Sequence, residues 1–512
     1  TAATDDRISG ILLQGQMIPI GYGSGYAALR EVRDALGYFQ EQGKPVFAYM
    51  ENPGIRDYYL GSIANQVLVN PYSVISFQGL ASQQIFFAGA LEKFGIDVQV
   101  VRVGEFKSAV EPFTRTDMSD ENRLQSEELL FDLWGNILAT VGESRQIAPQ
   151  ELHELSQRLG MLSAAEAVEE GLVDRVAYPD ELRVILSEAW NVEAFDDIPS
   201  VEIGKYIDTL DGRRSGRGEN LVAVVYLEGN IIGGVGRGVD IGADRFTKEI
   251  RRLREDDRVK AIVLRVNSPG GSAVAAEAIQ REIVLARQEK PVVVSFGAVA
   301  ASGGYWVAAE SDYIFAQPNT LTGSIGVFGL LPNVQELGNE LGITWDTVKT
   351  GPFADIHALS RPKTDEEIAR VEAFVAFIYD EFLTKVAQGR QMDMDRVEAV
   401  AGGRVWTGSQ ALQHGLIDQL GGLTAAIDKA VELGGITEDW QIYEYPRTKD
   451  LAEVIAELLS QSGVAIDLDA LPRKQAARIA AHLGNWDEMQ WIHALGDPRH
   501  SYARLPFDFR FH

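Results

Sequence analysis

Ser302 stands where a nucleophile would suit the chain. It lies in the stretch Ala301-Ser302-Gly303-Gly304, after an apolar run that predicts a strand, Pro291 to Phe296, and before a run that predicts a helix, Tyr305 to Glu310. A serine at a strand-to-helix turn lies beside helix N–H groups that have no partner, and small neighbours let another backbone approach closely. The position suits a nucleophile, although serine also favours it simply as an N-cap.

The elements that must position this serine belong to an internal repeat. Lys44-Pro45-Val46 recurs as Lys290-Pro291-Val292, and Gly171-Leu172-Val173-Asp174 recurs as Gly415-Leu416-Ile417-Asp418, at nearly the same separation. Repeats of this length indicate two copies of one domain. Each copy alternates short apolar runs with helical patterns, which predicts an α/β fold of crossover units.

The second copy gives the clearest secondary-structure signals, from runs of apolar residues and from apolar residues spaced three and four apart. Strands are predicted near Val222 to Leu227, Ala261 to Val266, Val292 to Phe296 and Tyr313 to Ala316, and helices near Arg245 to Arg254, Ala273 to Gln288 and Glu366 to Ala387.

The copies and their flanks predict a division of the chain. We expect a first repeat over residues 1–200, a linker over 201–219, a second repeat over 220–435 and a C-terminal extension over 436–512. We expect the linker because residues 208–218 are rich in Gly, Ser and charged residues. In the extension, 451–459 and 474–483 predict helices, and the aromatic, basic end 504–511 predicts a segment that docks on a neighbour.

The start of the first copy differs from that of the second. The second copy opens with the apolar run Leu221 to Leu227, and the first has no counterpart to it. The sequence therefore reads as beginning partway into the first copy, and a preceding segment could carry a membrane anchor.

The two copies differ at the positions that carry chemistry. Ile55 of the first copy aligns with Ser302, and the first copy also lacks the Pro-Gly-Gly turn that contains Gly270 and Gly271. In the opposite sense, Lys107 of the first copy aligns with Ala354 of the second. One copy holds a serine and the other a lysine, so the complementary losses predict a single site shared between the copies.

Such a site would hydrolyse an acyl bond. A serine hydroxyl needs a base, and a lysine can serve if burial keeps its amine neutral. Bare backbone N–H groups at Gly270 and Gly271 could hold the developing oxyanion. A histidine base is the rival: His357, with Asp355 two residues before it, could form a triad with Ser302, but this would leave Lys107 unexplained.

Four motifs together resemble the signal peptide peptidase A family in its long, two-repeat form. They are Ala301-Ser302-Gly303-Gly304-Tyr305-Trp306, Asn267-Ser268-Pro269-Gly270-Gly271, Thr322-Gly323-Ser324-Ile325-Gly326-Val327 and Lys107-Ser108-Ala109-Val110-Glu111-Pro112. The resemblance extends from Asp5 to about Gly435. It implies two tandem domains of the Clp-protease/crotonase fold, built from repeated ββα units, with a helical C-terminal extension.

The resemblance also implies roles for individual residues. Ser302 would be the nucleophile and Lys107 the general base, and the hydroxyl of Ser324 would orient the lysine amine. Gly270 and Gly271 would form the oxyanion hole, and Gly303 would bind substrate.

Family members are membrane-associated, ATP-independent serine endopeptidases that degrade cleaved signal peptides as oligomers. The implied partners are therefore apolar or unfolded peptides and further copies of the chain, with a tetramer expected. The implied location is a plasma or thylakoid membrane.

Composition narrows the remaining alternatives. The 512 residues carry a net charge of −27 and no cysteine, which argues against nucleic-acid binding and excludes thiolate catalysis and disulfides. No zinc-site spacing or nucleotide motif is present, so we expect neither metal nor cofactor. Two other functions stay open: an acyl-CoA enzyme of the crotonase type, which also uses paired glycines, and a non-catalytic scaffold with a vestigial site.

Overall fold

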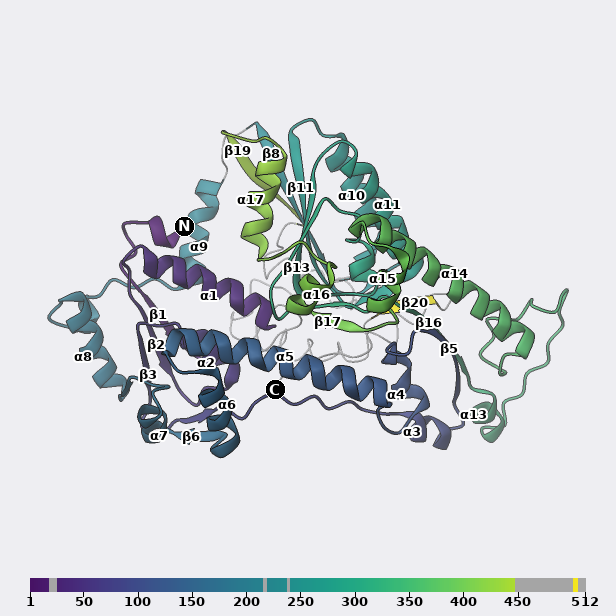
Figure 1. Ribbon diagram of the computed structural model, residues 1–512, viewed down its shortest axis with the longest axis horizontal. Helices are drawn as coiled ribbons and strands as arrows, with labels where there is room; N and C mark the ends of the chain where they lie inside the picture. The colour runs from purple at the N-terminus through teal and green to yellow at the C-terminus, as the bar shows by residue number, and fades with distance from the viewer. Residues whose placement is uncertain (18–24, 215–218, 237–239, 447–500, 505–512) are drawn as a thin grey trace, which may run out of the picture.

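The computed structural model describes residues 1–17, 25–214, 219–236, 240–446 and 501–504 (Figure 1). Within them the second repeat is built on a largely parallel sheet with the strand order β17-β15-β13-β11-β8-β19. Its outer strands are β15 (Leu321–Gly323), β17 (Val405–Thr407) and β19 (Trp440–Tyr445). Its central strands are β8 (Asn220–Glu228), β11 (Val259–Ser268) and β13 (Val292–Ala301). They are continuous apolar runs because helices cover both faces of the sheet.

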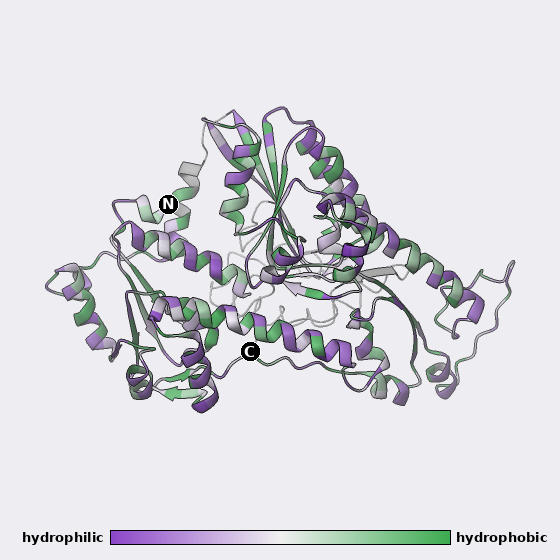
Figure 2. Cartoon of the chain, in the orientation of Figure 1, coloured by the Kyte–Doolittle hydropathy of each residue, from purple (hydrophilic) through white to green (hydrophobic). Residues whose placement is uncertain are grey.

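Alternate residues of these strands face different helices. Leu264 packs in one cluster with Phe246 of α10 (Ala243–Glu255) and Ile279 of α11 (Ala273–Arg287). Its neighbour Val263 packs with Ala426 of α17 (Leu423–Leu433) on the other face. The strands are coloured mainly as hydrophobic, and the helices alternate between hydrophobic and hydrophilic residues (Figure 2).

The first repeat has a smaller parallel sheet of the same kind, with the order β1-β2-β3-β7. Its strands are β1 (Ile11–Gln14), β2 (Val46–Met50), β3 (Gln66–Val69) and β7 (Arg175–Val176), flanked by α1 (Tyr26–Glu41), α2 (Ile55–Gly61) and α8 (Pro179–Trp190).

Equivalent bonds support the duplication. Tyr58 donates its hydroxyl hydrogen to Leu172 O at 2.7 Å, and Tyr305 donates in the same way to Leu416 O at 2.8 Å. The predicted two-copy α/β architecture is confirmed.

The repeats are joined by a strand that crosses from one to the other. β5 (Asp97–Val103) of the first repeat pairs antiparallel along its whole length with β16 (Val327–Asn333) of the second. The sheet that results has the order β10-β9-β12-β20-β16-β5. Its remaining strands are β9 (Ile231–Ile232), β10 (Ile241–Gly242), β12 (Gly270–Ser272) and β20 (Ser501–Arg504). The long helix α5 (Asp120–Arg145) reaches from the first repeat beneath the second (Figure 1), where Leu129 and Leu133 pack against Ala301 and Leu321.

Several boundaries differ from the sequence prediction. β13 continues five residues beyond Phe296 to Ala301, because Val299, Ala300 and Ala301 pair with β15 (Leu321–Gly323). The predicted helix Tyr305 to Glu310 is instead the single turn α12 (Gly303–Trp306) followed by turns. Much of the predicted linker is helical, as α9 (Ile203–Arg214). The predicted helices at 451–459 and 474–483 lie outside the described residues, as does 505–511.

The other predicted strands and helices of the second repeat are confirmed with shifts of a few residues at their ends, including α14 (Asp365–Arg390) and β14 (Tyr313–Ala316).

Candidate active site

Ser302 and Ser324 are brought together by two neighbouring strands. β13 and β15 are parallel, with Ala300 opposite Thr322 and Ala301 opposite Gly323. Each serine is the next residue along its strand, so both hydroxyls emerge at the same carboxyl edge of the sheet, where α/β folds place their sites. Ser302 N–H donates to Gly323 O at 2.8 Å, which fixes the two turns to each other.

The backbone at Ser302 adopts a strained conformation at the turn between β13 and α12. Its φ is 55° and ψ −118°, and Ser324 also has a positive φ of 51°. Non-glycine residues avoid this region, and such strain is concentrated at functional sites. The sharp strand-to-helix turn at Ser302 resembles the turns that present nucleophiles in other hydrolases.

Lys107 reaches these serines from the other repeat. Lys107 follows the end of β5, and Ser324 precedes the start of β16. Because β5 and β16 are antiparallel, with Val103 opposite Val327, the end of one strand lies beside the start of the other. Its loop is held by bonds from Phe106 N–H to Gly402 O at 3.0 Å and from Lys107 N–H to Gly104 O at 3.2 Å. A β-carbon on Gly403 would lie 2.6 Å from Lys107 N, so only glycine permits this close approach.

The Lys107 amine contacts both serines. Its Nζ lies 2.7 Å from Ser302 Oγ, 3.0 Å from Ser324 Oγ and 3.1 Å from Ser324 O. The distance to Ser302 falls within the range of about 2.6–3.2 Å expected for a nucleophile and its base. The split site therefore assembles within one chain.

Burial sets the protonation of this lysine. All three side chains have an exposed fraction of 0%, and burial lowers the pKa of Lys107 well below its usual value of 10.5. Desolvation penalises the ammonium form, and within the part of the chain that the structure describes no carboxylate acts on Lys107 in the opposite sense. The amine is thus far easier to deprotonate than that of a surface lysine.

The predicted oxyanion turn lies beside the nucleophile. Gly270 and Gly271 form part of β12 (Gly270–Ser272) with φ of 100° and 153°. A β-carbon on Gly304 would lie 2.7 Å from Ser268 O, so the start of α12 packs directly on this turn. Gly270 N–H donates to Ser268 Oγ at 3.1 Å, which gives Ser268 a role beyond forming the turn. Gly303 is the first residue of α12, where helix N–H groups lack intrahelical partners.

The histidine alternative finds no support in the geometry. Asp355 is held by Lys349 at 2.7 Å and by Arg361 at 2.8 Å. Asp355 therefore belongs to an ion-pair cluster with Lys349 and Arg361, and the basic side chain hydrogen-bonded to Ser302 is Lys107.

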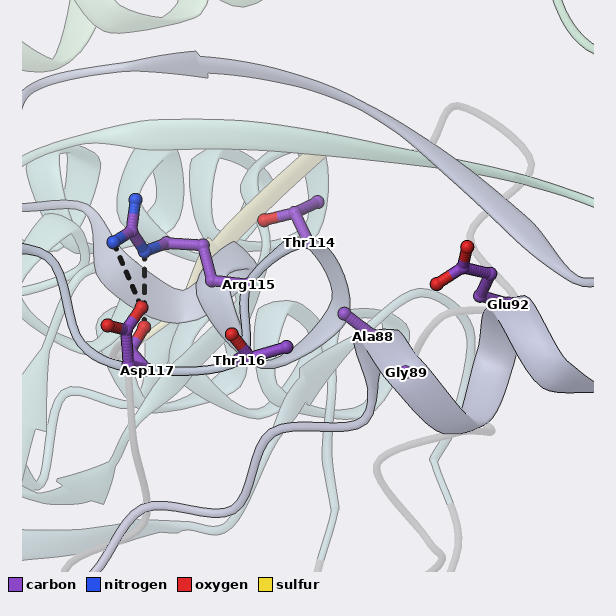
Figure 3. Close-up of a pocket in the computed structure, with 7 residues that line it drawn as sticks. All are labelled: Ala88, Gly89, Glu92, Thr114, Arg115, Thr116 and Asp117. Carbon is purple, nitrogen blue, oxygen red and sulfur yellow. Dashed lines mark hydrogen bonds and ion pairs between the residues drawn. The ribbon is translucent and has the colours of Figure 1, made fainter.

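A surface hollow lies apart from these residues, on the first repeat between α3 (Ala88–Lys93) and the turn after α4 (Glu111–Thr114) (Figure 3). Arg115 within it is bonded to the backbone and carboxylate of Asp117, both at 3.1 Å. Its lining includes neither serine nor the lysine, so it is not the site.

One residue beside the site escaped the sequence analysis. Gln125 of α5 is buried, and its amide donates to Phe106 O and to Ser108 Oγ, on either side of Lys107, and accepts from Val405 N–H of β17. Nothing in its local sequence signals this, because the contacts join segments far apart in the chain.

The fold, with a serine and a lysine brought together from the two repeats, favours a hydrolase, and comparisons with known proteins identify the family. The profile of peptidase family S49 matches residues 38–193 and 285–437, one match in each repeat. "Protease 4" of Salmonella typhi is 34% identical over 98% of this chain and 81% of its own length. "Serine protease SPPA, chloroplastic" of Arabidopsis thaliana is 34% identical over 85% of this chain and 64% of its own length. The "Putative signal peptide peptidase SppA" of Enterococcus faecium is 37% identical over 39% of this chain and 58% of its own length.

The chain belongs to peptidase family S49 and is a serine protease. The resemblance inferred from its motifs is confirmed. Family membership favours peptide hydrolysis over the acyl-CoA chemistry and the non-catalytic scaffold considered from the sequence.

Proposed function

We propose that the protein is an ATP-independent endopeptidase in which Ser302 is the nucleophile and Lys107 the general base. The observation that supports this best is the set of partners around one buried amine. A neutral amine has two N–H groups and one lone pair. With the N–H groups donating to Ser324 O and Ser324 Oγ, the lone pair is left for the hydroxyl hydrogen of Ser302.

In the proposed reaction Ser302 Oγ attacks the scissile carbonyl carbon while its proton passes to Lys107 Nζ. The carbonyl oxygen becomes an oxyanion, held by the backbone N–H groups of Gly271 and Gly303, while the Gly270 N–H donates to Ser268 Oγ. Lys107 then gives its proton to the leaving amine. Water then attacks the acyl-enzyme and gives its proton to Lys107 Nζ, which returns it to Ser302 Oγ as the bond from Ser302 Oγ to the acyl carbon breaks and the acid is released. Ser324 holds the amine throughout and binds no substrate.

For substrates we propose cleaved signal peptides and other apolar or unfolded peptides, cut at a membrane. The support is the name of the Enterococcus relative, a signal peptide peptidase, and the resemblance of the motifs. No helix among the described residues combines the length and apolarity that a membrane span requires. The proposed membrane is a plasma or thylakoid membrane, and the proposed assembly is a tetramer.

The deciding experiment measures hydrolysis of a fluorogenic apolar peptide. Ser302→Ala should remove activity, by a factor of about 10⁴ or more, since the residual rate comes only from binding and the oxyanion site. Ser311→Ala is the matched control, because Ser311 is equally buried but bonds only to the nearby Ala308 O. Equal activity in wild type and Ser302→Ala would refute the assignment. A serine-directed fluorophosphonate should label the wild type and not Ser302→Ala.

A further inference from the structure

A buried amide of α5 contacts the chain on both sides of the proposed base. Gln125 has an exposed fraction of 1%, although glutamine side chains usually lie at the surface. Its Nε2 donates to Phe106 O and to Ser108 Oγ, each at 3.2 Å. Both N–H bonds of the amide are therefore used on the short segment that has Lys107 at its centre.

The carbonyl group of the same amide binds the second repeat. Gln125 Oε1 accepts from Val405 N–H at 3.1 Å, and Val405 lies opposite Gly323 where β17 pairs with β15. The residue after Gly323 is Ser324, whose N–H donates to Arg404 O at 2.7 Å. One side chain thus links the lysine segment of the first repeat to the pair of strands that leads to Ser324 in the second.

The partners of the amide fix both its orientation and the type of residue. Phe106 O can only accept and Val405 N–H can only donate, so one orientation of the amide satisfies both. An ionised glutamate would offer no donor to the first partner, and lysine or arginine would offer no acceptor to the second. The position therefore suits a side chain that carries a donor and an acceptor together.

The two segments that Gln125 joins are also in direct contact with each other. Phe106 N–H donates to Gly402 O at 3.0 Å, and a β-carbon on Gly403 would lie 2.6 Å from Lys107 N. The lysine segment of the first repeat therefore lies against the chain that leads into β17 of the second. Gln125 bonds to both sides of this contact.

Charged groups on the elements around the lysine segment are paired with each other. Glu128 of α5 pairs with Arg404, and Glu111 of α4 pairs with Arg102 of β5 at 3.7 Å. Within the described part of the chain, burial is what lowers the pKa of Lys107. An uncharged amide can hold the segment in place without favouring the ammonium form, which a carboxylate would favour.

We propose that Gln125 is a positioning residue that holds Lys107 Nζ at bonding distance from Ser302 Oγ. Lysine has a long, flexible side chain, so the place of its amine depends on how firmly the segment that carries it is held. Gln125 fixes that segment to the repeat that carries the nucleophile, and it acts through Lys107 without touching substrate. This inference rests on the proposed catalytic roles of Ser302 and Lys107.

The first test measures hydrolysis of the fluorogenic apolar peptide by Gln125→Ala. Its kcat should fall about a hundredfold with little change in KM, because a small misplacement of a reacting group costs this much. The pH–kcat profile should move to higher pH, because a lysine held less tightly in its buried place regains a more ordinary pKa. Labelling by the serine-directed fluorophosphonate should slow in parallel with kcat, since it needs an activated serine but no peptide.

A second variant keeps the size of the side chain and covers the case in which Gln125→Ala does not fold. Gln125→Glu retains an acceptor for Val405 N–H but loses the donors and places a carboxylate beside the lysine segment. A nearby negative charge favours the ammonium form of Lys107, so the pH–kcat profile should again move to higher pH.

Two control variants separate positioning from a merely structural role. Gln99→Ala also removes an amide that joins the repeats, since Gln99 bonds to Lys363 N–H and O at 2.5 and 3.1 Å, away from the dyad. Ser126→Ala changes the next residue of α5, whose hydroxyl donates to Asn122 Oδ1 at 3.5 Å within the same helix. Both controls should keep the pH–kcat profile of the wild type.

Denaturant unfolding completes the comparison. Gln125→Ala and Gln99→Ala should lower the unfolding midpoint to a similar extent, whereas only the Gln125 variants should move the pH–kcat profile. An unchanged profile in the Gln125 variants, or a loss of kcat no larger than in Gln99→Ala, would overturn the positioning role.

Failure of this inference is distinguishable from failure of the proposed function. If Ser302→Ala or Lys107→Arg kept wild-type activity, the catalytic assignment would fall, and the positioning role with it. If both were inactive while the Gln125 variants matched Gln99→Ala and Ser126→Ala, the catalytic assignment would stand and the positioning role alone would fall.

Discussion

At the scale of single residues, the proposed chemistry depends on one amine whose pKa is lowered by burial and which has no charged partner among the described residues. Most serine hydrolases orient their base with a carboxylate. Here Ser324 supplies two oxygen acceptors instead, so the lysine is oriented without raising its pKa. A carboxylate in the same place would favour the ammonium form and remove the base.

The first prediction concerns the identity of the base. Lys107→Arg should lower kcat by about 10³-fold or more, because a guanidinium stays protonated at every working pH. Wild-type kcat/KM should rise with pH through the depressed pKa of Lys107 and then level off below pH 10.5. Near-native activity in Lys107→Arg, measured with the same fluorogenic peptide, would exclude Lys107 as the base.

The second prediction concerns stability. Since the folded-state pKa of Lys107 lies below its unfolded value of 10.5, the unfolded chain binds one more proton between those two values. Stability must therefore rise with pH across that window. Lys107→Met removes this contribution, so the wild type should gain free energy of unfolding relative to Lys107→Met between pH 7 and 10. Denaturant titrations at several pH values would measure it, and parallel pH curves would contradict it.

At the scale of elements, the site depends on how two domains dock. The sequence predicted both parts of the dyad, because the copies have lost opposite residues at Ile55 and Ala354. It could not predict that the parts meet within one chain, which follows from the pairing of β5 with β16. Nor could it predict Gln125, whose partners lie about twenty and nearly three hundred residues away. The spacing of apolar residues predicts helices and strands within short stretches of sequence. It does not predict which distant elements pack against each other.

The helix that the sequence predicted directly after Ser302 is not formed as expected. The run Tyr305 to Glu310 is apolar enough for a helix, yet it forms one helical turn and then irregular turns. Tyr305 and Trp306 are instead committed to the core, where Tyr305 bonds to Leu416 O and Trp306 packs on Phe382. Tertiary contacts have overridden helix propensity.

The third prediction tests the docking of the repeats. Arg265 of β11 pairs with Glu31 of α1 at 2.6 Å, and Glu31 also accepts from Leu423 N–H at 3.1 Å. Arg265→Met should lower the free energy of unfolding by about 2–3 kcal/mol, because it leaves a half-buried carboxylate without its partner. Peptidase activity should fall with it, as the first repeat carries Lys107.

A double-mutant cycle that adds Glu31→Gln measures the coupling free energy between Arg265 and Glu31, from the denaturant unfolding of the four proteins. The Glu31→Gln/Arg265→Met protein should recover part of the loss, since no charge is then left unpaired. Strict additivity of the two single changes would show that this ion pair does not couple the repeats.

At the scale of the whole molecule, an exposed apolar segment of the second repeat suits contact with another protein. Between α13 (Gln335–Glu340) and α14, Leu341, Ile343, Trp345 and Val348 are exposed, and Val348 is 99% accessible. We define these four residues as the apolar arm. It extends from the body of the second repeat (Figure 1). Clustered exposed apolar side chains commonly mark interaction sites, and a second copy of the chain is the partner that the proposed tetramer supplies.

The last prediction joins assembly to selectivity. Because Lys107 and Ser302 meet within one chain, dissociation should leave the chemistry intact, whereas an enclosed assembly should bar folded proteins from the site. Sedimentation of the wild type should show a species several times the monomer mass of 56.2 kDa. Val348→Asp should shift this towards the monomer, since burying a charge at an apolar contact is costly. It should keep kcat for a short peptide within about threefold and lose the preference for an unfolded protein over its folded form. Tyr72→Asp, at an 84% exposed site outside the arm, is the control and should change neither property. A wild-type monomer that digests folded and unfolded protein at equal rates would refute both the assembly and its role.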